Sequence, residues 1–491
     1  MKKLQILFFA ALSVLVTGCK HYLDEKTNGS LFGADALKSQ QGLEAALTGA
    51  YKGWESTWGT GFLHATAIAA TMGGDDVTTH KASNKSDFRE FDQFNVSATN
   101  QRTQALYSGC YKAIQGANNV IANYKNTTGA QATINAIAGE AYFLRGVSYY
   151  WLVRLYGKIP LLTNPNYSDS LLTIQSSEPA EVYKLIEADL TAAEGLVPDN
   201  KRDPGRPNKG SVKAYLADAY LTEAGWPLKQ TEKYALAAAK AKEVIDNKDL
   251  YGFQLLPTFA QVFENDPAKN GTPENVFQLS TFMGEGSTTS ANHGWSAMPG
   301  EESGWDDFFA ELKFFNDFPA GPRKDATFRT VFKKSSDGTL IPWEQSQTQH
   351  PYYLKYYIKG DVSNWASSVP EIMMRYAYVL TTYAEAEARA TGTPDALAYQ
   401  CVNAIRQRAG LPDLSGLTGP DFAAAVVQER AWEFAAERTR WFDLVRLEMV
   451  EQANATKDAN DLQPIGAITK EDYTFPLPFS ETSVNPNLGS R

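Results

Sequence analysis

The chain has 491 residues, of which 43% are hydrophobic and 21% are charged, the balance of an ordinary globular protein. Its formal net charge of −10 argues against a protein that binds nucleic acid through the phosphates. Aromatic residues make up 12% of the chain, and such rings can form a core or a surface on which ligands stack.

The N-terminus has the pattern of a lipoprotein signal peptide. Two lysines precede an apolar run, residues 4–16, that is too short for a permanent membrane-spanning helix. The run leads into Val-Thr-Gly-Cys at residues 16–19, which resembles the lipobox of bacterial lipoproteins. We expect a signal peptide over 1–18, lipid on Cys19 and a polar tether over 19–29. The alternative is an ordinary secretory cleavage site beside a chance cysteine.

Helical periodicity follows the tether and returns near the C-terminus. It predicts helices over residues 37–72, 107–124, 133–156, 181–196, 212–224, 234–245, 375–390, 395–408 and 422–438. Small residues crowd 214–221 and 235–241, which resembles the paired helices of tetratricopeptide repeats. We predict a mainly α fold with a tetratricopeptide-like helical-repeat scaffold over 30–249 and 371–491.

The segment from about 250 to 370 differs in kind. It is rich in Gly, Ser, Thr, Asn, Pro and aromatics, with little sustained periodicity. Loops this long are usually functional or disordered, and the many Trp and Tyr residues argue against disorder. We expect an ordered, loop-rich lobe laid on the helical scaffold, so that residues 30–491 form one domain. The two cysteines left for this domain, Cys110 and Cys401, are expected to be buried thiols, although a disulfide between them stays open.

Five motifs in chain order resemble those of SusD/RagB-type lipoproteins of Bacteroidetes. They are Tyr-Leu-Asp at 22–24, the Tyr-Lys-Ala-Ile and Ala-Asn-Asn-Val-Ile pair within 111–121, Arg-Tyr-Ala-Tyr-Val-Leu-Thr-Thr-Tyr-Ala-Glu-Ala at 375–386, the Glu-Arg to Asp-Leu-Val-Arg segment at 429–446, and the Pro-Leu-Pro to Asn-Pro-Asn-Leu tail at 476–488. The sequence departs from the family where two methionines precede Arg375, and where no Trp stands just before Tyr107.

The resemblance implies a surface lipoprotein of the outer membrane that binds glycans or other oligomeric nutrients and does not cleave them. It further implies a partner, a TonB-dependent SusC-like transporter barrel over which the protein sits as a hinged lid. The family also includes the possibility of a peptide-binding variant. We expect no cofactor and no metal site, because no ligand-spaced motif occurs; whether a structural calcium binds, for example near Gly74-Asp75-Asp76, stays open.

Charged residues near the C-terminus have a structural interpretation. Four of them lie at helical spacing near Trp432 and Trp441, and they predict a buried or half-buried ion-pair network that pins helices together. They are Arg438, Arg440, Asp443 and Arg446.

The sequence also leaves two other functions to consider, a glycosidase and an assembly scaffold. A glycosidase on a helical scaffold needs two facing carboxylates. Acidic residues do stand beside two tryptophans of the lobe, although adjacent acidic pairs in loops are usually solvated; they are Glu301, Glu302, Asp306 and Asp307. The sequence has no G-x-S-x-G, no H-E-x-x-H and no EF-hand pattern, so we expect no catalytic residue.

An assembly scaffold that binds only protein is the other alternative, and the aromatic-rich lobe speaks against it.

In the family, ligand contacts come from the loop after the first long helices and from the lobe, which here are residues 73–95 and about 281–365. Aromatic faces stack on the C–H faces of sugars while nearby polar groups bond the hydroxyls. Trp295 and Trp305 rank first, because no periodic apolar residues surround them. The full set of ligand-binding candidates, each of which could instead be core, is Trp54, Trp58, Asp75, Asp76, His80, Trp295, Trp305, Trp343, Tyr352 and Trp365.

Overall fold

The computed structural model describes residues 35–55, 61–62, 65–166, 168–264, 270–280, 293–357 and 369–489. The expected signal peptide, Cys19 and the tether lie outside these residues, as do the candidates Trp58 and Trp365. Among the described helices, none combines the length and the apolar character needed to cross a membrane.

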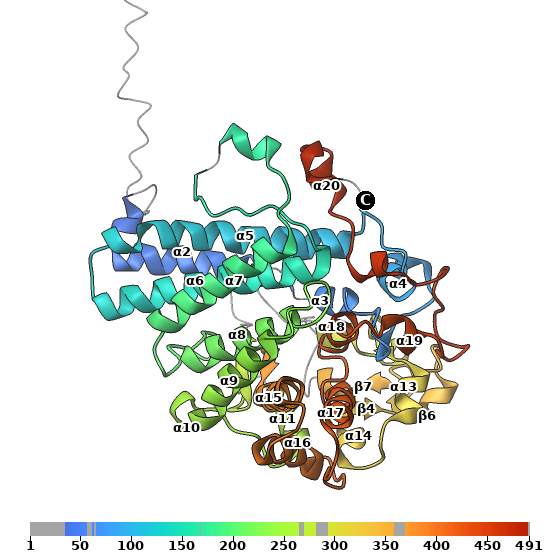
Figure 1. The fold of residues 1–491 in the computed structure, drawn as a ribbon. Helices are drawn as coiled ribbons and strands as arrows, with labels where there is room; N and C mark the ends of the chain where they lie inside the picture. The colour runs from blue at the N-terminus through green and yellow to red at the C-terminus, as the bar shows by residue number, and fades with distance from the viewer. Residues whose placement is uncertain are drawn as a thin grey trace, which may run out of the picture.

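Four long helices form the upper layer of Figure 1. They are α2 (Gln40–Lys52), α5 (Gln101–Asn123), α6 (Gln131–Tyr156) and α7 (Pro179–Leu196). Helix α6 packs against the other three and is buried along most of its length, so it forms the centre of this layer. It ends at Gly157, whose positive φ of 69° suits glycine and stops the helix as predicted.

A second group of helices lies below the first. It contains α8 (Lys209–Glu223), α9 (Lys233–Asp246), α15 (Tyr376–Thr391), α16 (Ala396–Arg408) and α17 (Gly419–Glu433). Helix α15 packs against α8 and α9 although more than a hundred residues separate them, so the lobe is inserted into one continuous helical array (Figure 1). The structure confirms the predicted mainly helical, tetratricopeptide-like fold.

Shorter helices complete the described chain. They are α3 (Thr66–Ala69), α4 (Ser86–Asp92), α10 (Lys248–Tyr251), α11 (Phe259–Val262), α12 (His293–Ser296), α13 (Leu312–Asp317), α14 (Pro322–Thr327), α18 (Arg440–Arg446), α19 (Val450–Asn454) and α20 (Phe479–Thr482). The helical pattern predicted over 37–72 therefore corresponds, in its described part, to α2 and the short α3.

Helix α17 ends five residues earlier than predicted. Ala436 and Arg438 have φ values of 59° and 66°, which take the chain out of the helix. The turn lets the Arg438 guanidinium reach the Glu371 carboxylate, and it lets the Ala436 N–H donate to the Asp76 side chain. Contacts made elsewhere in the fold thus override the local helical pattern.

The strands are short and form four antiparallel pairs among the described residues. These are β1 (Val77–Thr78) with β3 (Phe309–Ala310), β2 (Asn275–Leu279) with β8 (Glu371–Arg375), β4 (Phe328–Arg329) with β7 (Tyr352–Tyr353), and β5 (Val331–Lys333) with β6 (Leu340–Pro342). Because β2 and β8 stand near the two ends of the insertion, their pairing closes the base of the lobe. The β1–β3 pair fastens the loop after α3 to the lobe.

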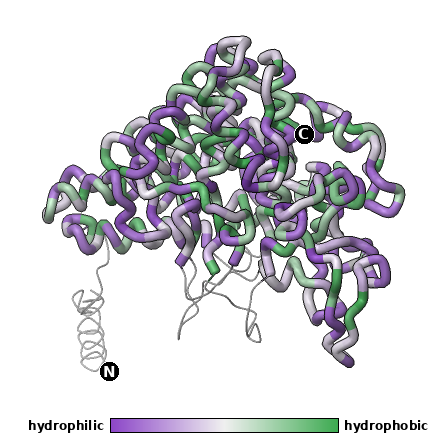
Figure 2. Tube along the Cα trace, turned by 90° about the horizontal axis from the view of Figure 1, so that it is seen from below, coloured by the Kyte–Doolittle hydropathy of each residue, from purple (hydrophilic) through white to green (hydrophobic). Residues whose placement is uncertain are grey.

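In the described part of the chain, the buried apolar side chains form two hydrophobic cores. The larger one joins both helical layers to part of the lobe. The smaller one lies within the lobe and consists of Phe309, Phe332, Ile341 and Tyr352, with Trp343 packed against it. Figure 2 shows hydrophobic and hydrophilic residues alternating along the helices, the pattern expected when one face of each helix is buried. Cys110 and Cys401 are free and buried.

Three glutamates link the lobe to the scaffold. Glu429, Glu433 and Glu437 recur at every fourth residue along α17 and just beyond it. We call them the glutamate ladder. Its partners are Arg323 and Lys355 from the lobe, Arg375 from β8, and Arg406 and Arg408 from α16. The ladder therefore joins lobe and scaffold through buried ion pairs.

The predicted C-terminal ion-pair network is confirmed. Arg446 donates to both carboxylate oxygens of Glu385 at 2.7 and 2.6 Å, and to Asp443 at 2.8 Å. Arg440 holds Asp75 through two bonds of 2.5 and 2.7 Å. All these groups except Asp75 are buried, so the network pins helices together.

The C-terminal tail, residues 447–489, runs back over the N-terminal half of the chain. The Phe475 N–H donates to the Leu155 carbonyl at 2.6 Å, and the Phe479 N–H donates to the Ala98 carbonyl at 2.8 Å. Lys457 lies buried between the carboxylates of Asp92 and Glu311. The tail thus covers the end of α6 and the segment before α5.

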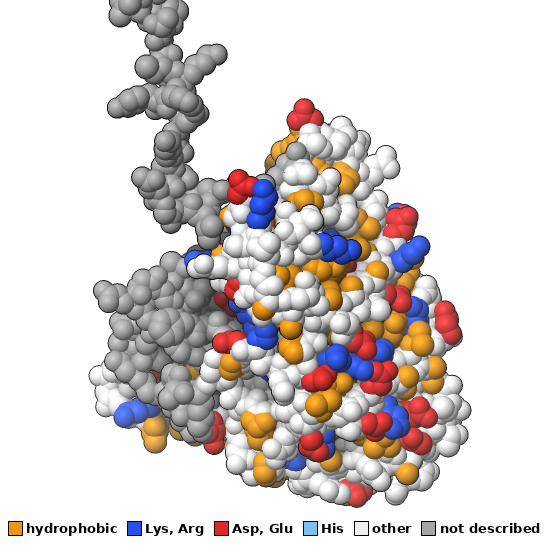
Figure 3. Space-filling view, turned by 90° about the vertical axis from the view of Figure 1, so that its left-hand side faces the viewer, with side chains coloured by type: hydrophobic (Ala, Val, Ile, Leu, Met, Phe, Trp, Pro, Cys, Tyr) orange, Lys and Arg blue, Asp and Glu red, His pale blue; other side chains and the backbone are white. Residues whose placement is uncertain are grey.

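Figure 3 shows the face that lies to the left in Figure 1. On this face, acidic and basic side chains are interspersed, with apolar atoms between them. A face with both signs mixed differs from the basic stripe that nucleic-acid-binding domains present.

Candidate functional site

The structure brings together the two segments from which ligand contacts were predicted. β1 pairs with β3, so that Val77 lies opposite Ala310 and Thr78 opposite Phe309. One residue further on, the Thr79 hydroxyl donates to the Asp307 carbonyl at 2.7 Å. The loop after α3 and the lobe therefore pack against each other through buried residues.

Two partly exposed tryptophans of the lobe, Trp295 and Trp305, lie next to this contact in the chain, since the Asp307 N–H donates to the Ser296 carbonyl at 2.9 Å. The ring centroids of Trp295 and Trp305 are 6.2 Å apart, and the ring planes are inclined by 39°. We call them the tryptophan pair. A tight turn holds them together, because the Trp305 N–H donates to the Trp295 carbonyl at 2.9 Å. Gly304 is required in this turn, since a Cβ there would lie 2.1 Å from the Met298 carbonyl oxygen.

Asp306 follows the pair directly and is fixed from two sides. One carboxylate oxygen accepts the Gly300 N–H at 2.7 Å and the Tyr352 hydroxyl at 2.5 Å. Burial raises the pKa of Asp306, while the two hydrogen bonds and the nearby His80 act in the opposite direction. His80, a predicted candidate on the other segment, therefore lies within electrostatic reach of Asp306.

A polar cavity of about 260 Å³ opens beside these groups. Exposed or half-exposed amide and hydroxyl groups line it together with two histidines and the Phe309 ring. The lining residues are Thr78, Thr79, His80, Lys81, Phe309, Gln347, Thr348, Gln349, His350, Asn460, Asp461 and Leu462. The Gln347 N–H donates to the Glu301 carboxylate at 2.6 Å, which connects the cavity wall to the turn of the tryptophan pair.

Two predicted stacking residues prove to be core. Trp54 is 0% exposed, contacts Phe62 and Phe277, and donates its indole N–H to the Ser148 hydroxyl at 3.0 Å. Tyr352 is also 0% exposed and belongs to the small core of the lobe. A ring with no exposed face offers nothing for a sugar to stack on, so both predictions were wrong.

The two aspartates of the first segment serve the scaffold. Asp75 is occupied by Arg440, as described above. Asp76 is 3% exposed, and its carboxylate accepts the Ala436 N–H at 2.8 Å. Burial, with a smaller contribution from Asp75, raises the pKa of Asp76 to about 7. Neither side chain is placed to bond a sugar hydroxyl in this structure.

The Asp76→Asn variant tests this assignment. An aspartate whose folded pKa exceeds its unfolded value stabilises the fold below pH 4, and this contribution is lost as pH rises through about 7. Asparagine keeps an oxygen for Ala436 but cannot ionise. We expect the melting temperature of the variant, relative to that of wild type, to rise between pH 4 and pH 8.5, as measured by differential scanning calorimetry. Equal pH profiles would contradict the shifted pKa, and lost glycan binding with unchanged stability would contradict a structural role.

Of the lobe candidates, Trp343 remains to be placed, together with the acidic residues near the tryptophan pair. Trp343 is half-buried, and its ring centroid lies 5.8 Å from that of Phe315, so at least part of the ring packs within the lobe. The acidic residues near the tryptophan pair are engaged: Glu302 accepts from Arg329 and from the Lys333 N–H, and Asp307 pairs with Lys85. Within the described ranges, no group of three or more His, Cys, Asp or Glu side chains is arranged to hold a metal ion.

Sequence reasoning missed part of the cavity wall. Gln347 and Gln349 lie inside the predicted segment, but only aromatic, acidic and histidine side chains were sought there. Asn460 comes from the tail, and its Asn-Asp-rich neighbourhood indicates a turn without indicating where that turn lies. The structure adds these three amides to the site.

The fold and its surface define a tetratricopeptide-like scaffold that carries a loop-rich lobe. A family model described as the SusD family matches residues 187–490, and one described as "Starch-binding associating with outer membrane" matches residues 21–221. SusD-like protein P2 of Formosa agariphila is 30% identical, with 99% of each chain covered. The chain therefore belongs to the SusD family.

Solved structures agree on the fold. A SusD superfamily protein from Parabacteroides distasonis superposes with a TM-score of 0.81 at 24% identity, covering 92% of this chain and 98% of its own. Surface glycan-binding protein A from Bacteroides uniformis gives 0.77 at 22% identity, and a laminarin-binding SusD-like protein gives 0.76 at 22%. In both cases 92% of this chain and 99% of the other are covered.

Proposed function

We propose that this protein is a cell-surface lipoprotein that binds a glycan and delivers it to a partner TonB-dependent transporter of the outer membrane. The observation that carries the proposal is the partly exposed tryptophan pair beside a polar cavity. The two features supply the two kinds of contact that a sugar needs.

The chemistry of the surface suits an oligosaccharide. The C–H faces of pyranose rings are apolar and stack on aromatic rings, and the inclined tryptophans offer two such rings to successive sugars. Amide side chains carry both donors and acceptors, so Gln347, Gln349 and Asn460 match hydroxyl groups, which also do both. Asp306 is held rigidly between Gly300 and Tyr352, which fixes the turn on which Trp305 lies.

The relatives support the substrate class and the location. One structural neighbour is described as laminarin-binding and another as a surface glycan-binding protein. The model that matches residues 21–221 is described as starch-binding and associated with the outer membrane. Lipid on Cys19 would hold the protein there, since each buried methylene contributes about 0.8 kcal/mol. On this proposal, residues 30–491 form one domain that moves as a unit over the transporter.

We further propose that the protein binds its glycan without cleaving it. Glu301, Glu302 and Asp307 each hold a backbone N–H or a cation, and Asp306 holds a hydroxyl and an N–H. These bonds serve the architecture of the lobe. A glycosidase would instead present two facing carboxylates, one to donate a proton and one to attack or to activate water.

The test uses the soluble protein lacking residues 1–19. We expect it to be retarded in affinity electrophoresis by at least one polysaccharide of a panel that includes laminarin, starch, xylan and mannan. The bound polysaccharide should release no new reducing ends over hours. Sustained release would favour the glycosidase. Failure to bind any glycan, together with capture of a protein partner, would favour the assembly scaffold.

A further inference from the structure

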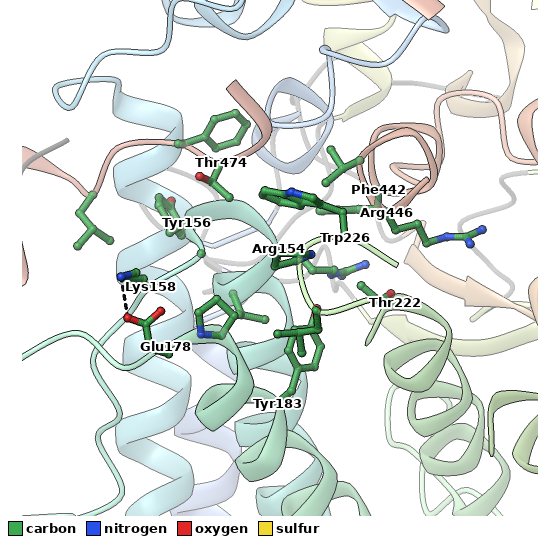
Figure 4. A pocket seen from close by; sticks show the side chains of 18 of the residues that line it. Arg154, Tyr156, Lys158, Glu178, Tyr183, Thr222, Trp226, Phe442, Arg446 and Thr474 are labelled. Atoms are coloured by element: carbon green, nitrogen blue, oxygen red, sulfur yellow. Dashed lines mark ion pairs between the residues drawn. The ribbon is translucent and has the colours of Figure 1, made fainter. Parts of the chain in front are cut away.

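A second, larger cavity lies apart from the site described above. It encloses about 590 Å³ between the end of α6, the start of α7, the end of α8, α18 and the C-terminal tail. None of its lining residues belongs to the polar cavity. Figure 4 shows Arg154 and Trp226 at its centre, Tyr183 on one side, Thr474 on the opposite side, and the Lys158–Glu178 ion pair at its edge.

Arg154 is the unusual group in this cavity. Its guanidinium lies between two aromatic rings, 3.6 Å from the centroid of Tyr150 and 3.9 Å from that of Phe442. Contacts this close engage the π-faces of both rings. A guanidinium held this way is fixed in orientation before any ligand arrives.

The N–H groups of the Arg154 guanidinium have few hydrogen-bond partners among the described residues. Nε donates to the Tyr150 carbonyl at 3.1 Å, and no carboxylate of the described residues lies within 4.0 Å of the guanidinium. The Asp218 carboxylate acts on Arg154 electrostatically, but its two oxygens already accept hydrogen bonds from the hydroxyls of Tyr150 and Tyr378. Arg446, which lines the same cavity, is by contrast saturated by Glu385 and Asp443.

The rest of the wall is mainly apolar and aromatic. It is formed largely by Val153, Tyr183, Trp226, Phe442, Phe475 and Leu477. A volume of this size falls in the range of small-molecule sites, which are typically apolar with a few polar groups that fix orientation. Such a wall suits an aromatic ring or an alkyl chain.

We propose that this cavity binds a small organic carboxylate with an aromatic or aliphatic body. The carboxylate accepts two parallel N–H bonds from the terminal nitrogens of Arg154, and the body lies against Trp226 and Tyr183. Charge-assisted bidentate pairs of this kind are strong and geometrically specific. The site is separate from the glycan surface and does not depend on it.

The direct test compares a carboxylate with its neutral isostere. 3-Phenylpropionate and 3-phenylpropionamide are titrated into the mature chain lacking residues 1–19, and binding is measured by calorimetry. We expect the acid to bind and the amide to bind at least about 10-fold more weakly, since bonds to a charged group contribute about 1.5–3 kcal/mol. Decanoate is titrated as well, as a carboxylate with an aliphatic body. Equal binding of the acid and the amide would overturn the proposal, and so would a failure of all three compounds to bind.

Variants locate the site. Arg154→Met keeps most of the bulk between the two rings and removes the charge, so affinity for the acid should fall to that for the amide. Arg102→Met is the matched control, because Arg102 stacks on Phe88 at 4.4 Å but lies outside both cavities, and it should bind normally. The Trp295→Ala/Trp305→Ala variant should also bind the acid normally, which separates this site from the glycan proposal.

A second readout covers the case in which Arg154→Met does not fold. The wild-type chain labelled with 5-fluorotryptophan gives a separate resonance for Trp226, assigned with Trp226→Phe. Saturating 3-phenylpropionate should shift that resonance while those of Trp295 and Trp305 stay in place. An unmoved Trp226 signal would overturn the proposal.

Discussion

Replacing Glu433 by alanine is expected to lower the free energy of unfolding by about 3–5 kcal/mol. Glu433 is 0% exposed, and its two oxygens contact the guanidinium groups of Arg323, Arg375 and Arg408 at 3.1, 3.0 and 2.5 Å. Removing the carboxylate leaves these buried cations with one negative charge fewer. The cost is the desolvation of cations that no longer have enough partners.

The effect should depend on pH. The surrounding arginines hold the pKa of Glu433 well below its usual range, so its stabilising contribution is present above about pH 4.5 and is lost as pH falls. Urea unfolding of wild type and Glu433→Ala should therefore differ most near pH 7 and differ less at pH 3. Glu178→Ala is the matched control: Glu178 is paired with Lys158 but 61% exposed, and its loss should cost less than about 1 kcal/mol. A similar cost for both variants would contradict the prediction.

The double variant Trp295→Ala/Trp305→Ala is expected to weaken glycan binding by more than about 100-fold without a shift in melting temperature. Both rings are partly exposed, and they meet on a turn held by backbone bonds that alanine leaves intact. Removing them takes away the apolar faces on which sugar rings stack. Affinity electrophoresis and thermal unfolding of the same preparations check the two halves of the prediction.

Trp432→Ala provides the control for a lost indole. Trp432 lies on α17, is half-buried against the large core, and belongs to neither cavity. This variant should retain glycan binding even where it loses some stability. A marked fall in the melting temperature of the double variant would instead show that Trp295 and Trp305 are core residues.

Most of the fold could be predicted from sequence because its helices are local. The periodicity over 133–156 and 181–196 predicted α6 and α7 to within about two residues, and Gly157 marked the end of α6. The end of α17 could not be predicted, because the turn at Ala436 is set by Asp76, which lies far away in sequence. The partners of the glutamate ladder were likewise hidden, since they come from four separate segments.

The candidate site was predictable in outline only. The family's order of motifs indicated the two segments, and the β1–β3 pair shows that they meet. The absence of periodic apolar neighbours ranked Trp295 above Trp54, and in the structure Trp295 is partly exposed while Trp54 is fully buried. The amide of Asn460 was invisible, because its loop reaches the cavity only after the chain has folded back.

The C-terminal tail has a consequence for how the chain is made. Backbone contacts of Phe475 and Phe479 close the first helical layer, yet Phe475 is synthesised long after its partner Leu155. The early helices therefore cannot reach their final packing while the ribosome is still extending the chain. Completion of the first helical layer is thus coupled to the synthesis of a segment that lies far from it in the sequence.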